Sequence, residues 1–211
     1  MQADEPTLPE PLEELLLRAG FSATGHYDEL IIGSLSSSDP RVRVLALRAG
    51  VRRSLTARDH WLVSLRDPDV DVRREALTLL AHDPIEDDEV LRAVLGALDD
   101  EDALVVDGAI FCLGEHLYVD AVEELSVIAI NHEDARCRES AVAALGAIGD
   151  DRGRASILAA LDDKPPVRRR AIVALSNFEG PDIDAALTKA SEDRDWQVRA
   201  AVDQLNRDEL D

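Results

Sequence analysis

One short motif recurs six times along the 211 residues of this chain. It reads Asp-x-x-Val-Arg-x-x-Ala in its most regular form, as at residues 69–76. The apolar residues at its fourth position are Val42, Val72, Val105, Cys137, Val167 and Val198. Neighbouring copies are therefore 30 to 33 residues apart. Internal repetition at this period indicates that similar small units stack on one another along the chain.

The apolar residues within each copy recur with the period of an α-helix. The fourth copy places five of them on one helical face: Cys137, Ala141, Ala144, Leu145 and Ile148. A second segment with helical spacing precedes each motif, and Asp39 with Pro40 is suited to begin a helix. Each period therefore predicts helix A, a turn, helix B and a second turn. Such units cannot bury their apolar faces alone, so we expect an all-α solenoid.

The flanking residues can be assigned around these units. Residues 1–10 contain two prolines and three acidic residues and are expected to be disordered. Residues 11–24 are expected to form a helix that caps the first repeat. The repeat domain is expected to span residues 25–211, with repeats at about 25–54, 55–85, 86–118, 119–149, 150–180 and 181–211.

The composition argues against several partners and compartments. The chain has 44 acidic and 23 basic residues, a formal charge of −21, and its aromatic content is 3%. This charge repels phosphate groups, so we expect no nucleic-acid partner and no membrane partner. Adaptation to high salt would produce the same acidity. With two cysteines, no signal peptide and no apolar run that spans a bilayer, the chain is expected to be cytoplasmic and monomeric.

Residues 137–150, Cys-Arg-Glu-Ser-Ala-Val-Ala-Ala-Leu-Gly-Ala-Ile-Gly-Asp, resemble a HEAT-like repeat. The resemblance is to the short type named after the phycobilisome lyases, and it covers roughly residues 26–211. It implies a right-handed α–α superhelix, an α-solenoid of about six helix-turn-helix repeats with an N-terminal capping helix. These repeats serve many unrelated tasks, so the resemblance is specific for the fold and not for a function.

An arginine recurs beside the buried stripe, and an aspartate recurs near the preceding turn. The residues concerned are Asp39, Arg43, Asp69, Arg73, Asp134, Arg138, Arg168, Asp195 and Arg199. Stacking is expected to bring the aspartate of one unit close to the arginine of a neighbour, forming a structural ladder. The alternative is a row that binds anions. Repetition in every unit favours the structural role over a single binding site.

The sequence shows no constellation of catalytic residues. The five histidines lack the helical spacing of metal ligands. Some HEAT-like hydroxylases hold iron through His-Glu pairs, but this chain has Arg-Glu or Arg-Arg at 74–75, 138–139 and 169–170. Cys112 and Cys137 are expected to be buried about 10 Å apart along the helix axes and unpaired. We therefore expect no enzyme activity, no catalytic residue, no metal and no cofactor.

The leading functional hypothesis is a non-enzymatic scaffold that binds a peptide or protein partner. The resemblance implies that the side of helix B opposite the core lines a concave groove. Its charges cancel in the sequence, five arginines against five acidic residues. The residues expected to hold the partner are Arg48, Arg52, Arg74, Phe111, Arg169 and Arg170. Arginine and aromatic residues are enriched at interfaces, so this set favours a partner with acidic and apolar groups.

Two other functions follow only from the resemblance. One is lyase-like or chaperone-like handling of a linear tetrapyrrole or phycobiliprotein, and the sequence has few aromatic residues to enclose a pigment. The other is nucleic-acid handling by a solenoid of the HEAT-like glycosylase type, which the acidic composition disfavours.

Overall fold

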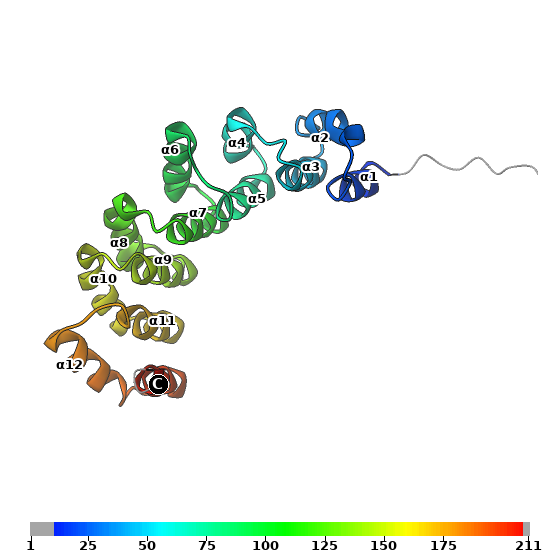
Figure 1. Ribbon diagram of the computed structural model, residues 1–211. Coiled ribbons are helices and arrows are strands. Elements are labelled where there is room, and N and C mark those ends of the chain that lie inside the picture. The colour runs from blue at the N-terminus through cyan, green and yellow to red at the C-terminus, as the bar shows by residue number, and fades with distance from the viewer. Residues whose placement is uncertain (1–10, 209–211) are drawn as a thin grey trace, which may run out of the picture. The chain divides into compact units, whose positions relative to one another are not determined.

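The computed structural model describes residues 11–208, and the disorder expected for residues 1–10 lies outside them. In this part of the chain the regular structure is helical and no β-strand occurs. No helix among these residues is long and apolar enough to cross a membrane. The chain forms two compact units, Met1–Leu79 and Leu80–Asp211. Both are built from consecutive helix pairs, so the fold is the all-α solenoid that the repeat predicts (Figure 1).

The first unit consists of one helix followed by two helix pairs. Its helices are α1 (Leu12–Ala19), α2 (Asp28–Ser34), α3 (Pro40–Arg52), α4 (Arg58–Leu65) and α5 (Val70–Leu80). The B helices of the pairs are α3 and α5. Helix α1 packs along α3 and also contacts α2. It therefore covers the apolar side of the first helix pair.

The second unit consists of four helix pairs. Its helices are α6 (Asp88–Gly96), α7 (Ala103–Glu115), α8 (Val122–Asn131), α9 (Ala135–Ile148), α10 (Arg154–Ala159), α11 (Pro165–Leu175), α12 (Pro181–Ala190) and α13 (Trp196–Asp208). The B helices are α7, α9, α11 and α13, and each packs on the next in this order. Figure 1 shows α7, α9 and α11 side by side, with α8 and α10 on one side of them.

The motif aspartate begins the B helices. Five of these carboxylates accept a hydrogen bond of 2.8 to 3.0 Å from the backbone N–H two residues later: Asp39, Asp69, Asp102, Asp134 and Asp195. Helix α11 begins instead with Pro165 and Pro166, which need no backbone partner in the first turn. Each cap stabilises its helix by about 1 kcal/mol, and together the caps explain why the aspartate recurs.

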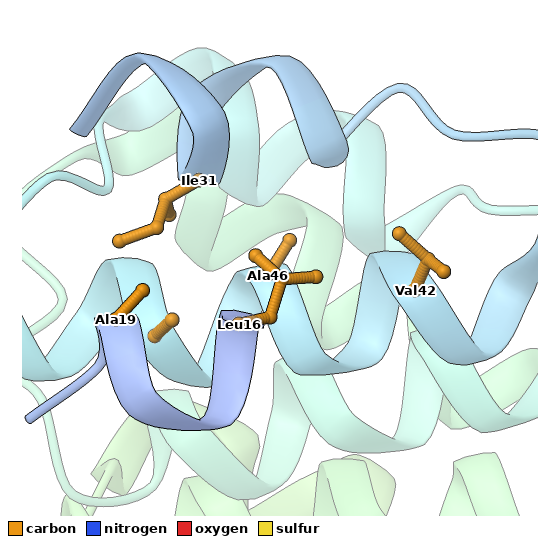
Figure 2. Close-up of a cluster of buried hydrophobic side chains, with 6 residues drawn as sticks. Leu16, Ala19, Ile31, Val42 and Ala46 are labelled. Carbon is orange, nitrogen blue, oxygen red and sulfur yellow. The ribbon is translucent and has the colours of Figure 1, made fainter. Parts of the chain in front are cut away.

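The core is aliphatic and rich in small residues. The alanine that ends the motif is fully buried in five copies, at Ala46, Ala76, Ala109, Ala141 and Ala171. In the first unit, Leu16 and Ala19 of α1 pack with Ile31 of α2 and with Val42 and Ala46 of α3 (Figure 2). Because alanine occupies the motif's last position in these five copies, helices A and B can approach closely there.

Glycines allow neighbouring B helices of the second unit to touch. Gly146 of α9 faces Ala174 of α11, and a Cβ on Gly146 would lie 2.5 Å from the Cβ of that alanine. Gly114 of α7 faces Ala144 of α9, where the corresponding distance would be 3.0 Å. Carbon atoms that are not bonded pack at about 3.5–4.0 Å. The two glycines therefore permit the close approach of α7 to α9 and of α9 to α11.

The close contact of α9 with α11 leads to a stability prediction. Gly146→Ala is expected to lower the free energy of unfolding by about 1–3 kcal/mol, because the new methyl group must push the two helices apart. Gly96→Ala is the matched control, since this glycine is helical and a Cβ there would meet nothing within 4 Å. The control should leave stability unchanged or raise it by up to about 1 kcal/mol. Urea unfolding measures both, and equal effects would contradict the close contact.

Candidate functional site

Three of the recurrent arginines connect a B helix to the helix pair that follows it in the same unit. Their Nε and Nη2 atoms donate to the two oxygens of one aspartate, at distances from 2.6 to 2.9 Å. The pairs are Arg43–Asp67, Arg138–Asp163 and Arg168–Asp193. A planar guanidinium matches a carboxylate in this two-bond geometry, which makes such hydrogen bonds strong and directional. We call each of these pairs a rung.

The same guanidinium groups also hold the turn within their own helix pair. Nη1 donates to a backbone carbonyl five or six residues earlier, at 2.6 to 2.8 Å. The bonds run from Arg43 to Ser37, Arg73 to Asp67, Arg138 to His132, Arg168 to Asp163 and Arg199 to Asp193. In a rung, one side chain therefore joins two turns.

The carboxylates that accept the rungs differ from those expected from the motif. Asp39, Asp69, Asp134 and Asp195 cap B helices instead of accepting from a neighbouring unit's motif arginine. The acceptors lie one or two residues before the cap position, in a turn whose composition varies between copies. Ser37 and His132 occupy the corresponding place in two other copies. Because this position varies, the motif does not identify the acceptor aspartates.

At the junction of α7 with α9, a valine and a histidine stand where other copies have a rung. Val106 is buried at the arginine position of α7. His132 stands five residues before Cys137, as the acceptor Asp67 stands five residues before Val72. His132 Nδ1 still accepts from the backbone N–H of Asp134, at 3.1 Å. Because arginine and aspartate are absent together, the junction buries no charge without its partner.

Other contacts join α7 to α9. Ser140 Oγ lies 2.5 Å from Asp107 Oδ1, and the Cys137 thiol donates to the carbonyl of Ala103 at 3.2 Å. Both bonds involve the N-terminal halves of the helices, whereas the contact of Gly114 with Ala144 lies in the C-terminal halves. These hydrogen bonds and the helix packing thus stand at this junction in place of an Arg–Asp rung.

A hollow of about 660 Å³ lies against α1, α3 and α5 in the first unit. Its charged lining residues are Glu13, Arg41, Arg48, Asp69, Asp71, Arg74 and Glu75. Arg48 donates two hydrogen bonds of 2.6 Å to Glu75, and Arg74 lies 3.2 Å from Asp71. Two of the three arginines in this hollow are therefore paired with carboxylates of the chain itself.

A shallow groove crosses α7, α9 and α11 in the second unit. It consists of two hollows of about 360 and 210 Å³ that share Ala143, Ala147 and Arg170. Phe111 and Val173 contribute exposed apolar surface to it, at 44% and 52% exposure. We call this surface the α7–α9–α11 groove, defined by Phe111, Gly114, Glu115, Glu139, Ser140, Ala143, Ala144, Ala147, Arg170 and Val173.

The six residues expected to hold a partner lie in different places. Arg48 and Arg74 line the hollow of the first unit, and Phe111 and Arg170 line the groove of the second. The Arg52 guanidinium lies 4.7 Å from the centroid of the Phe21 ring, a cation–π contact. Arg169 donates to the side-chain oxygen of Gln197 at 3.2 Å. Arg170 lies 3.6 Å from Glu139.

The alanines of the groove carry no clear signal in the sequence. Ala143 and Ala147 are common helix formers, and nothing in their identity distinguishes a groove floor from an ordinary exposed face. Only the adjacent exposed Phe111 and the close helix packing reveal their role.

The cysteines and histidines have structural environments. Cys112 and Cys137 are free and buried, as expected. Burial raises the pKa of the Cys112 thiol to about 12 and that of Cys137 to about 11, so neither is a thiolate at neutral pH. His60 caps α4 and His116 lies 2.8 Å from the Leu80 carbonyl oxygen. Within residues 11–208, no His, Cys, Asp and Glu side chains are grouped to hold a metal ion.

A family model for HEAT repeats matches residues 99–176 and 122–206. Together these overlapping matches span residues 99–206, which is 108 of the 211 residues. The chain belongs to the HEAT repeat family. This membership confirms the resemblance seen at residues 137–150. No match was found among the curated proteins compared with the chain.

Several solved structures share the HEAT-like fold. The YibA protein of Escherichia coli has a TM-score of 0.65 and 18% identity, covering 94% of this chain and 75% of that protein. An engineered protein has a TM-score of 0.60 and 20% identity, with coverage of 84% and 94%. A designed armadillo repeat protein in complex with a (KR)4 peptide has a TM-score of 0.53 and 14% identity, with coverage of 94% and 99%. At these identities the likeness shows the fold alone.

The rung of Arg138 and Asp163 predicts a specific pH dependence of stability. Asp163→Asn is expected to lower the free energy of unfolding at neutral pH by about 1.5–3 kcal/mol, because it removes the charged acceptor. The exposed neighbour Asp162 gives the control, since Asp162→Asn removes only a 3.4 Å contact with Lys189. The control should change stability by less than about 1 kcal/mol.

The hydrogen bond from Arg138 lowers the pKa of the Asp163 carboxyl below its usual value. Its contribution to stability is therefore complete above the unfolded pKa of about 3.9 and is lost as the pH falls through the lower folded pKa. The difference between the native chain and Asp163→Asn should stay constant from about pH 7 to 5 and shrink below about pH 4. Urea unfolding at several pH values measures this, and a pH-independent difference would contradict the rung.

Proposed function

We propose that this chain is a non-enzymatic interaction scaffold that binds a short apolar segment of another protein in the α7–α9–α11 groove. The observation that carries the proposal is the exposed ring of Phe111 beside the small residues Ala143 and Ala147. A bulky apolar side chain of the partner can lie against this ring and above the two alanines, whose side chains are short. Aromatic anchors in such positions supply much of the binding energy at protein interfaces.

The dimensions of the groove favour a peptide segment. Packed helices have axes about 8–10 Å apart, so a path across α7, α9 and α11 is about 16–20 Å long. About six residues of extended chain cover this distance, as do about 13 residues of helix. The groove is open along its length, which suits a linear segment better than an enclosed small molecule.

One similar structure is a precedent for a bound peptide. The designed armadillo repeat protein with the same type of fold is in complex with a short peptide. Neither alternative function gains support from the family or from the similar structures. The groove has one aromatic residue in its lining, which is little to enclose a tetrapyrrole. The acidic charge of the chain opposes nucleic-acid binding.

A labelled peptide of about 13 residues tests this proposal, with leucines three and four positions apart and glutamine elsewhere. Binding is measured by fluorescence polarisation to the full chain. Phe111→Ala is expected to weaken binding by about tenfold, because the apolar anchor is lost. Phe111 is partly exposed, so the melting midpoint should change little.

Val127→Ala is the matched control for this substitution. Val127 is an apolar residue of α8 with 60% exposure and does not line the groove. Its substitution should leave the affinity unchanged. Failure of the peptide to bind, or an equal loss of affinity in both variants, would contradict the proposed site.

A further inference from the structure

We infer that the segment bound in the α7–α9–α11 groove is basic, with lysine or arginine flanking its apolar residues. This inference rests on the proposed function of the groove. From the sequence alone, the arginines favour an acidic partner. In the structure, however, several of these arginines pair with carboxylates of the chain itself. Arg48 binds Glu75, Arg74 contacts Asp71, and Arg170 lies beside Glu139. The positive charge of these arginines is therefore partly neutralised before any partner binds.

The acidic charge of the chain is concentrated in the unit that carries the groove. Met1–Leu79 contains 13 acidic and 10 basic residues, a formal charge of −3. Leu80–Asp211 contains 31 acidic and 13 basic residues, a formal charge of −18. A summed potential of this kind attracts partners of opposite charge and speeds their association. The second unit therefore favours the approach of a basic segment.

The charges inside the groove point in the same direction. Glu115, Glu139 and Arg170 are its charged residues, which gives a net charge of −1. Arg170 faces Glu139 at 3.6 Å, with side-chain exposures of 44% and 25%. In the part of the chain that the structure describes, the exposed Glu115 carboxylate makes no ion pair. The charge left for a partner is therefore a carboxylate.

Glu115 is placed to act together with the apolar anchor. It follows Phe111 by four residues in α7, so the two side chains lie one turn apart on the same face of the helix. Both line the same hollow. A partner whose apolar side chain rests on Phe111 would place its neighbouring lysine or arginine near Glu115. The apolar contact with Phe111 and the ionic contact with Glu115 could therefore be made by neighbouring residues of one segment.

Three labelled peptides test the inference. They share the leucine positions of the glutamine peptide used above and carry lysine, glutamine or glutamate at the flanking positions. At about 50 mM salt, the lysine peptide is expected to bind about tenfold more tightly than the glutamate peptide, with the glutamine peptide between them. At about 500 mM salt this difference should shrink to less than about threefold, because salt screens exposed charges.

Two variants distinguish the effect of the Glu115 carboxylate from the effect of the overall negative charge of the second unit. Glu115→Gln is expected to weaken binding of the lysine peptide by about threefold or more and to leave the glutamine peptide unaffected. Glu124→Gln removes the same charge from an exposed position of α8 outside the groove and should weaken the lysine peptide by less than about twofold. Equal effects of the two substitutions would overturn the role of Glu115.

The outcomes distinguish this inference from the proposed function. Binding of the glutamine peptide that depends on Phe111, together with equal or tighter binding of the glutamate peptide, would overturn the basic partner and leave the groove in place. Binding of the lysine peptide that is insensitive to Phe111→Ala would place the site elsewhere and overturn both. Absence of binding by all three peptides would also overturn both.

Discussion

The guanidinium group of the motif arginine is the contact that fixes how one helix pair stacks on the next wherever a rung is present. In Arg138, Nη1 holds the His132 carbonyl of its own turn, while Nε and Nη2 hold the Asp163 carboxylate of the next. Lysine has one point charge and could not make this set of bonds in a fixed plane. A largely buried charge is costly unless it is paired. The rung therefore specifies how far one helix pair can shift against the next, and Val106 with His132 shows what replaces it when both charges are absent.

The shallow groove follows from the same packing. Gly114 and Gly146 allow α7, α9 and α11 to touch, and small alanines line the surface beside these contacts. Longer residues at these positions would separate the helices or fill the surface. The small residues at these helix contacts thus also form an apolar floor beside the exposed ring of Phe111, which is the surface we propose for the partner.

The sequence predicts the fold well because its signals are local. Helical period, capping aspartates and buried alanines all act within one copy of the motif, and Cys112 and Cys137 are buried as their place in the stripe suggests. Contacts between copies are harder to predict, because they depend on how one helix is shifted along the next. Asp163 lies outside the motif and so is not recognised as the partner of Arg138. The pairing of Arg170 with Glu139 is missed for the same reason, and with it the sign of the charge left in the groove.

The absent rung and the groove involve the same pair of helices. Phe111 belongs to α7 and Ala143 to α9, the junction at which Val106 and His132 replace the charged pair. A partner that touches both residues connects these helices from the exposed side. Its binding free energy would add to the stability of the folded unit, because the unfolded chain offers no such surface. The α7–α9 junction thus lacks the Arg–Asp ion pair that is present at the two junctions that follow it. The proposed ligand would connect α7 to α9 where the chain has no such ion pair.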